Sequence, residues 1–105
     1  MLKIYGVVLE VAREVRGVIG EIERKDPDLA RQMRRAMCSV ALNLSEGMYS
    51  RGKNRGCRYH TAMGSMRETL SCIEVGVALG YVEGVEPEML GRIDHVLGTL
   101  FKLSV

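Results

Sequence analysis

The sequence is poor in the residues that typify small β-sheet and disulfide-rich domains. Its 105 residues include no Trp, one Phe and two Pro, whereas a β-rich domain usually carries more aromatic and turn-forming residues. Three cysteines without a C-x-x-C pair predict neither a disulfide framework nor a structural zinc site. No apolar run is long enough for a membrane span, and charges from Glu10 onward interrupt any signal-peptide pattern. We therefore expect a protein of the reducing cytoplasm that makes no membrane contact.

Hydrophobic residues, 47% of the chain, recur at steps of three and four along four segments, which is typical of amphipathic helices. The predicted helices span residues 3–24, 27–47, 55–79 and 86–103 of a single domain, 1–105. Asp26 and Pro27 are expected to begin the second helix, and Gly80 to end the third in a left-handed conformation. Four such helices with short connections predict an all-α fold, an antiparallel up-down-up-down four-helix bundle.

The apolar stripes also predict which side chains form the core. The stripe of the third helix includes Val77 and Leu79, and that of the fourth includes Leu90 and Phe101. Gly64 lacks a side chain and is expected to let two helices approach closely.

The net charge of +2 is unevenly distributed along the chain. Residues 24–67 carry ten basic and three acidic side chains, a net +7, whereas residues 1–23 carry −1 and residues 68–105 carry −4. Arginine binds phosphate oxygens with a planar fork of donors, so this basic block predicts salt-dependent nucleic-acid binding. The candidate residues are Arg31, Arg34, Arg51, Lys53, Arg55 and Arg58. The alternative is a solvated surface with salt bridges to the acidic last helix.

A polar stripe runs beside the apolar face of the second helix and continues on the third. We interpret it as a structural network in which Arg35 or Arg67 neutralises the carboxylates while amide and hydroxyl groups satisfy the remaining donors. A pocket with a carboxylate pair is the alternative. The residues of the predicted network are Gln32, Arg35, Asn43, Glu46, Ser65 and Glu68.

The sequence contains no motif that predicts catalysis. A di-iron site in a bundle needs Glu-x-x-His on two helices, and neither His60 nor His95 has a Glu three residues before it. A phosphate-binding P-loop, a dinucleotide fingerprint and a nucleophile elbow are also missing. We therefore expect a protein that is not an enzyme, with no metal and no cofactor.

Several spaced blocks in the middle of the chain resemble a bacterial family. They read LARQMRRA at residues 29–36, SVALNLSEG at 39–47, AMGSMRE at 62–68 and GYV at 80–82, with Arg51 in a basic loop between them. Together they resemble the four-helix-bundle proteins first noted in intervening sequences of 23S ribosomal RNA genes. The resemblance implies a homo-oligomer, often a pentameric ring, without an established catalytic activity.

A related branch of that family implies a function. Its members are accessory proteins of diversity-generating retroelements, in which a basic barrel engages reverse transcriptase and nucleic acid. From the resemblance we expect a non-catalytic homo-oligomeric accessory or scaffold protein, a pentamer, that contacts RNA or DNA and has a reverse transcriptase as a further partner. The alternative is an assembly module that recognises protein only. Met48 and Tyr49, in the predicted second connection, are hypothesised to pack across a subunit boundary.

Overall fold

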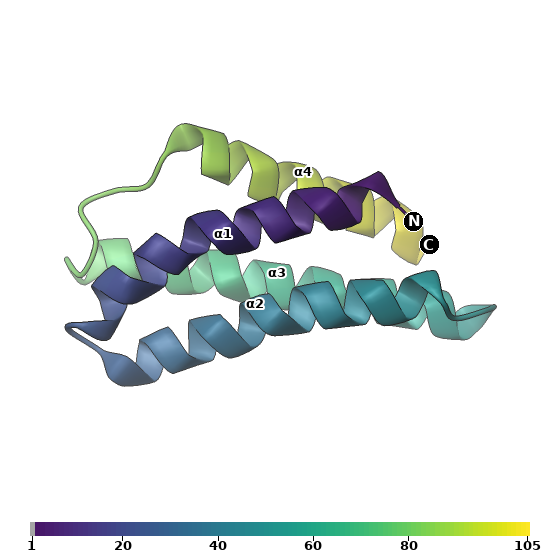
Figure 1. Cartoon of the computed structure of the whole chain (residues 1–105), viewed down its shortest axis with the longest axis horizontal. Coiled ribbons are helices and arrows are strands. Elements are labelled where there is room, and N and C mark those ends of the chain that lie inside the picture. The colour runs from purple at the N-terminus through teal and green to yellow at the C-terminus, as the bar shows by residue number, and fades with distance from the viewer. Residues whose placement is uncertain (1) are drawn as a thin grey trace.

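The computed structural model describes residues 2–105 and shows an all-α bundle of four helices (Figure 1). The chain runs up and down through the bundle, and the α2–α3 connection lies at the same end as both termini (Figure 1). Each helix packs against its neighbours in chain order, and α4 returns to pack against α1. The predicted fold class is confirmed. The helices are α1 Lys3–Glu23, α2 Pro27–Met48, α3 Lys53–Ala78 and α4 Pro87–Ser104.

The helix ends differ from the predicted ranges by at most two residues. The largest difference is at the start of α3, which begins at Lys53 rather than at residue 55, and α2 continues one residue further than predicted, through Met48. Gly47 and Gly56 lie inside the predicted helices and are helical in the structure. The connection is therefore only four residues long, 49–52, and Gly52 adopts a positive φ of 60° there.

Local interactions of side chain and backbone explain two of the helix ends. At the start of α2, Asp26 Oδ1 accepts a hydrogen bond from the backbone N–H of Leu29 at 3.0 Å, and Pro27 occupies the first turn. At the end of α3, Gly80 has a φ of 77°, and the N–H of Tyr81 donates to the carbonyl of Gly76 at 2.8 Å. This is the left-handed termination that the sequence predicts.

The core is a continuous apolar cluster along the bundle axis. The β-branched residues of α1 have weak helix propensity, so burial against the other helices must stabilise this helix. The buried side chains of α1 are Ile4, Val8, Val11, Val15, Val18, Ile19 and Ile22.

Four residues of the predicted apolar stripes are not in the core. Val77, Leu79, Leu90 and Phe101 are all exposed, Phe101 by 61%. Leu90 and Phe101 each follow a buried residue of α4, and a single step along a helix turns a side chain by about 100° away from its neighbour. Val77 follows the buried Gly76 in the same way, and Leu79 is the C-terminal cap residue of α3. The prediction was wrong at these positions because it made the stripes too wide.

The prediction that Gly64 allows close packing is also wrong. Gly64 is exposed, and a Cβ there would meet no atom within 4 Å. The close approaches are at Gly47 and Gly76. A Cβ on Gly47 would lie 2.5 Å from a ring carbon of Tyr59, and one on Gly76 would lie 3.0 Å from Ile22 Cδ1.

Candidate nucleic-acid interface

A cluster of cations lies at the end of the bundle where α2 passes into α3. Residues 47–67 carry five basic side chains and no Asp or Glu. Within the part of the chain that the structure describes, Arg51, Lys53 and Arg55 take part in no ion pair. We call these three residues the connection cluster. All three are exposed, so an anion in solvent could reach them.

The position of Arg55 is fixed by a backbone hydrogen bond. Its Nε donates to the carbonyl oxygen of Ser50 at 2.9 Å, which folds the side chain over the connection. The terminal nitrogens of the guanidinium are not used by this bond. Arg55 therefore presents donors to solvent in a partly fixed orientation, as phosphate recognition by arginine requires.

The N-terminus of α3 adds to the positive potential of the connection cluster. Its N-cap residue is Gly52, no side chain caps the free N–H groups, and the first turn has no acidic residue. The N-terminal end of a helix carries a partial positive charge, which acidic residues normally complement. Accordingly, α2 and α4 have Asp28 and Glu88 in their first turns, whereas α3 has Lys53 and Arg55.

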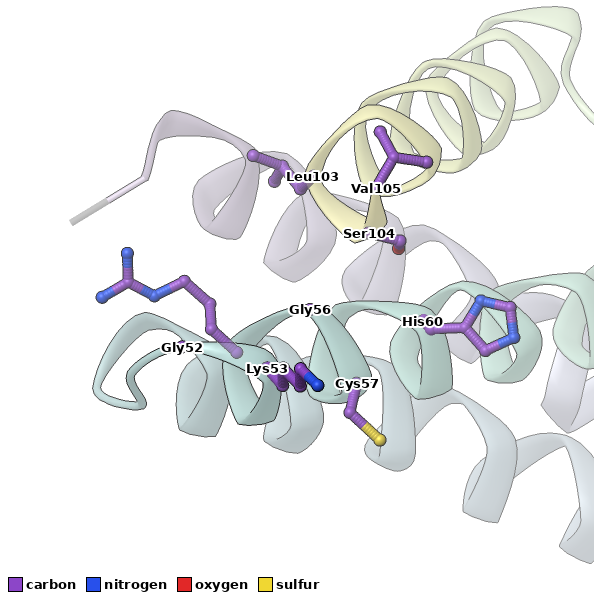
Figure 2. Close-up of a pocket in the computed structure, with 9 residues that line it drawn as sticks. Gly52, Lys53, Gly56, Cys57, His60, Leu103, Ser104 and Val105 are labelled. Carbon is purple, nitrogen blue, oxygen red and sulfur yellow. The ribbon is translucent and has the colours of Figure 1, made fainter.

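A groove of about 600 Å³ separates the start of α3 from the last residues of α4 (Figure 2). In Figure 2, Lys53, Cys57 and His60 follow one another along α3, and Leu103, Ser104 and Val105 form the facing wall. The two helices approach each other at Gly56, where a Cβ would lie 3.4 Å from the carbonyl oxygen of Ser104. The groove therefore joins a basic wall to a partly apolar one.

Two of the predicted nucleic-acid-binding residues, Arg31 and Arg34, lie far from the connection cluster. They are in the first half of α2, about 20 Å or more from its C-terminal end at 1.5 Å per residue. Each is engaged in an ion pair: Arg31 with Asp28, and Arg34 with Glu23. The hydrogen bond from Arg34 lowers the pKa of Glu23 and raises that of Arg34. The six predicted residues therefore do not form one continuous surface.

Arg58, also predicted to bind nucleic acid, belongs to the polar network between α2 and α3. Its guanidinium pairs with the Glu46 carboxylate at 3.0 Å and donates to Asn43 Oδ1 at 3.3 Å. The prediction had assigned the neutralisation of Glu46 to Arg35 or Arg67. The predicted arginine was wrong because the register between α2 and α3 decides which arginine reaches Glu46, and spacing along one helix does not fix that register.

The centre of this network is a hydrogen bond between two serines. Ser39 Oγ and Ser65 Oγ lie 2.7 Å apart, and the amide of Asn43 donates to the carbonyl oxygen and the hydroxyl of Ser39 at 2.9 and 3.0 Å. Beneath them, the fully buried Thr69 donates to the carbonyl oxygen of Ser65 at 2.9 Å. Thr69 was missed, although its spacing of seven residues from Ala62 places it on the buried face of α3.

The other predicted network residues lie at the surface. Gln32, Arg35 and Glu68 are exposed and line a groove of about 490 Å³ above the serine pair. Within residues 2–105, neither Arg35 nor Glu68 forms an ion pair. The structure thus separates the predicted set into a bonded network of Asn43, Ser65 and the exposed Glu46 and a polar rim of Gln32, Arg35 and Glu68.

The described residues were also compared with the requirements of a metal site and of a membrane-spanning helix. Residues 2–105 contain no group of three His, Cys, Asp or Glu side chains placed to hold a metal ion. Within the same residues, none of the four helices is both long enough and apolar enough to cross a membrane.

The chain matches a family model. The family model described as 23S rRNA-intervening sequence protein matches residues 1–101. No curated protein and no solved structure matches the chain.

Proposed function

Because this chain belongs to the 23S rRNA-intervening sequence protein family, we propose that it is a non-catalytic, homo-oligomeric accessory or scaffold protein of the bacterial cytoplasm that contacts RNA or DNA. In this proposal the chain assembles with further copies of itself into a pentamer. Its other partners are a nucleic acid and a reverse transcriptase, as in the retroelement accessory proteins that the sequence resembles. The contact surface is the connection cluster rather than the whole basic block.

The observation that carries the proposal is that Arg51, Lys53 and Arg55 are exposed and form no ion pair within residues 2–105. Like charges held close together at the positive end of a helix repel one another, and a bound anion relieves that repulsion. Uncapped N–H groups at the same place are further donors for phosphate oxygens. A phosphodiester backbone supplies the anion repeatedly and needs no particular base sequence.

Self-association would strengthen such binding. A ring presents the connection cluster once per subunit, so a long nucleic acid that contacts several copies binds more tightly than one cluster would allow. Exposed apolar side chains are available for subunit contacts, such as Leu42, which is 63% exposed in the middle of α2. These residues support the oligomer proposal, which light scattering of the purified protein would test.

Titration of labelled RNA and DNA at two salt concentrations tests the nucleic-acid proposal. We expect affinity to fall steeply between about 50 and 200 mM salt, because each phosphate contact releases a counterion. The triple variant Arg51→Glu, Lys53→Glu, Arg55→Glu is expected to abolish binding. The matched control reverses three exposed cations of α1 and the α1–α2 turn, namely Arg16, Arg24 and Lys25, and is expected to retain most of the affinity.

The second candidate function is a protein-only assembly module, which the exposed Leu42 and Phe101 favour. The same titration separates the two proposals. Absence of binding at low salt would contradict the nucleic-acid proposal and leave the assembly module. Equal loss in the two triple variants would contradict a site at the connection cluster.

A further inference from the structure

Tyr49 differs from the other three tyrosines in its surroundings. It stands in the α2–α3 connection with 83% of its surface exposed, whereas Tyr59 is buried and Tyr5 and Tyr81 pack against the core. Burial in its own chain therefore does not account for an aromatic side chain at this position.

The ring of Tyr49 shares a small hollow with Arg55. The hollow has a volume of about 250 Å³ and is completed by Leu2, Met48 and the buried Tyr59. This volume is below the range of about 300–1,000 Å³ typical of sites for drug-sized ligands, and it suits one flat group. Arg55 also lines this hollow and is tied through Nε to the carbonyl of Ser50, so an exposed aromatic residue and a cation border the same space.

We propose that the α2–α3 connection binds single-stranded nucleic acid, with an unpaired base stacked on Tyr49 and the neighbouring phosphates on Arg55, Arg51 and Lys53. This inference rests on the proposed function and names the kind of nucleic acid that the same site takes. Proteins that bind single strands combine a basic track with aromatic rings for the bases, because every base has a π face. A base inside a duplex is already stacked and paired, so Tyr49 has no access to it.

The test compares one strand with the same sequence in a duplex. Fluorescence anisotropy would measure binding of a labelled single strand of about 20 nucleotides, longer than the site of a small single-strand-binding domain, and of a hairpin duplex. We expect the wild-type protein to prefer the single strand. Tyr49→Ala should weaken single-strand binding by roughly five- to a hundredfold, since stacking of one base has that effect, and should leave duplex binding unchanged.

Two variants serve as controls, one for the loss of the Tyr49 hydroxyl and one for the loss of an exposed apolar side chain. Tyr49→Phe keeps the ring and should keep the preference for a single strand. Leu79→Ala removes an exposed side chain at the opposite end of the bundle and should change neither affinity (Figure 1).

The outcomes separate this inference from the proposed function. Equal affinity for single strand and duplex, with Tyr49→Ala without effect, would overturn the stacking site while salt-dependent binding through Arg55 upholds the proposed function. No binding of either probe at low salt would overturn both. If light scattering gave the Tyr49→Ala protein a smaller oligomer mass than the wild type, Tyr49 would lie in a subunit contact, and this result would also overturn the inference.

Discussion

The guanidinium of Arg92 on α4 holds the carboxylate of Glu14 on α1 through two parallel hydrogen bonds, with 2.7 Å between Nε and Oε1. The two residues are 78 positions apart, and their pair joins the last helix to the first. The hydrogen bond from Arg92 lowers the pKa of Glu14, against the opposing effect of partial burial. The ionised carboxylate therefore stabilises the closed bundle.

The first prediction concerns the pH dependence of stability. The pKa of Glu14 is lower in the folded than in the unfolded chain, so its stabilisation is present above the ordinary value of 4.5 and is lost as pH falls through the folded value. Glu14→Gln should lower Tm at neutral pH by about 2–5 °C, and the difference from wild type should shrink in acid. Thermal unfolding followed by circular dichroism across pH measures this.

Arg92→Gln supplies the partner arm of a double-mutant cycle. If the two side chains act as a pair, the double variant Glu14→Gln, Arg92→Gln should lose less stability than the two single variants together. Strict additivity of the losses would contradict the pair.

The second prediction concerns the close approach of α2 and α3 at Gly47. An added Cβ would lie 2.5 Å from the ring of the buried Tyr59, so the ring or the helix must move. Gly47→Ala should therefore reduce the free energy of unfolding by about 1–3 kcal/mol, as overpacking does. Urea denaturation measures the change.

Gly64→Ala is the matched control for Gly47→Ala. Gly64 is also helical, but a Cβ there meets no atom within 4 Å. Alanine should raise the free energy of unfolding by about 0.5–1 kcal/mol, because it restricts the unfolded chain and favours the helix. Equal effects of the two substitutions would contradict the close contact at Gly47.

The third prediction concerns the serine pair between α2 and α3. Ser39→Ala removes the partner of the Ser65 hydroxyl at 2.7 Å and also the hydroxyl that accepts from Asn43. Ser65→Ala removes only the 2.7 Å bond and leaves Ser39 its bond from Asn43. Each should reduce the free energy of unfolding by about 1 kcal/mol, and the double variant by less than the sum of the two, because one hydrogen bond is lost only once. Losses that add fully would show that the two hydroxyls are not coupled.

The sequence predicts the helices of this protein well because their signals are local. Asp26 begins α2 and Gly80 ends α3, in both cases with hydrogen bonds between residues a few positions apart. The spacing of apolar residues locates the four helices. The predicted α2–α3 connection, residues 48–54, is three residues too long, although Gly47 and Gly56 beside it are correctly predicted to be helical. In the structure both glycines are helical and serve close contacts with another helix, which depend on tertiary packing.

The candidate site was only partly predictable for the same reason. Spacing places Asn43 and Glu46 on one face of α2, but it does not tell which arginine of another helix reaches them, and that residue is Arg58. Composition groups Arg31 with Arg51, whereas the length of α2 separates them and Asp28 pairs with Arg31. The nucleic-acid function itself stays a prediction.

The last prediction separates the connection cluster from the network by comparing two arginines one turn apart on α3. Arg55 forms no ion pair within residues 2–105, so Arg55→Ala should remove a phosphate contact and reduce the slope of log K against log salt by about 0.7–0.9. Its stability should be unchanged, because its bond to Ser50 lies in the exposed connection.

Arg58→Ala should have the opposite pattern. It removes the contacts to Glu46 and Asn43, so the free energy of unfolding should fall, by at most about 1 kcal/mol for a pair this exposed, while the salt slope stays near that of wild type. Nucleic-acid titration and urea denaturation of the same two proteins measure both quantities. A slope reduced equally in the two variants would mean that Glu46 does not withhold Arg58 from phosphate, and that the interface extends from the connection along α3.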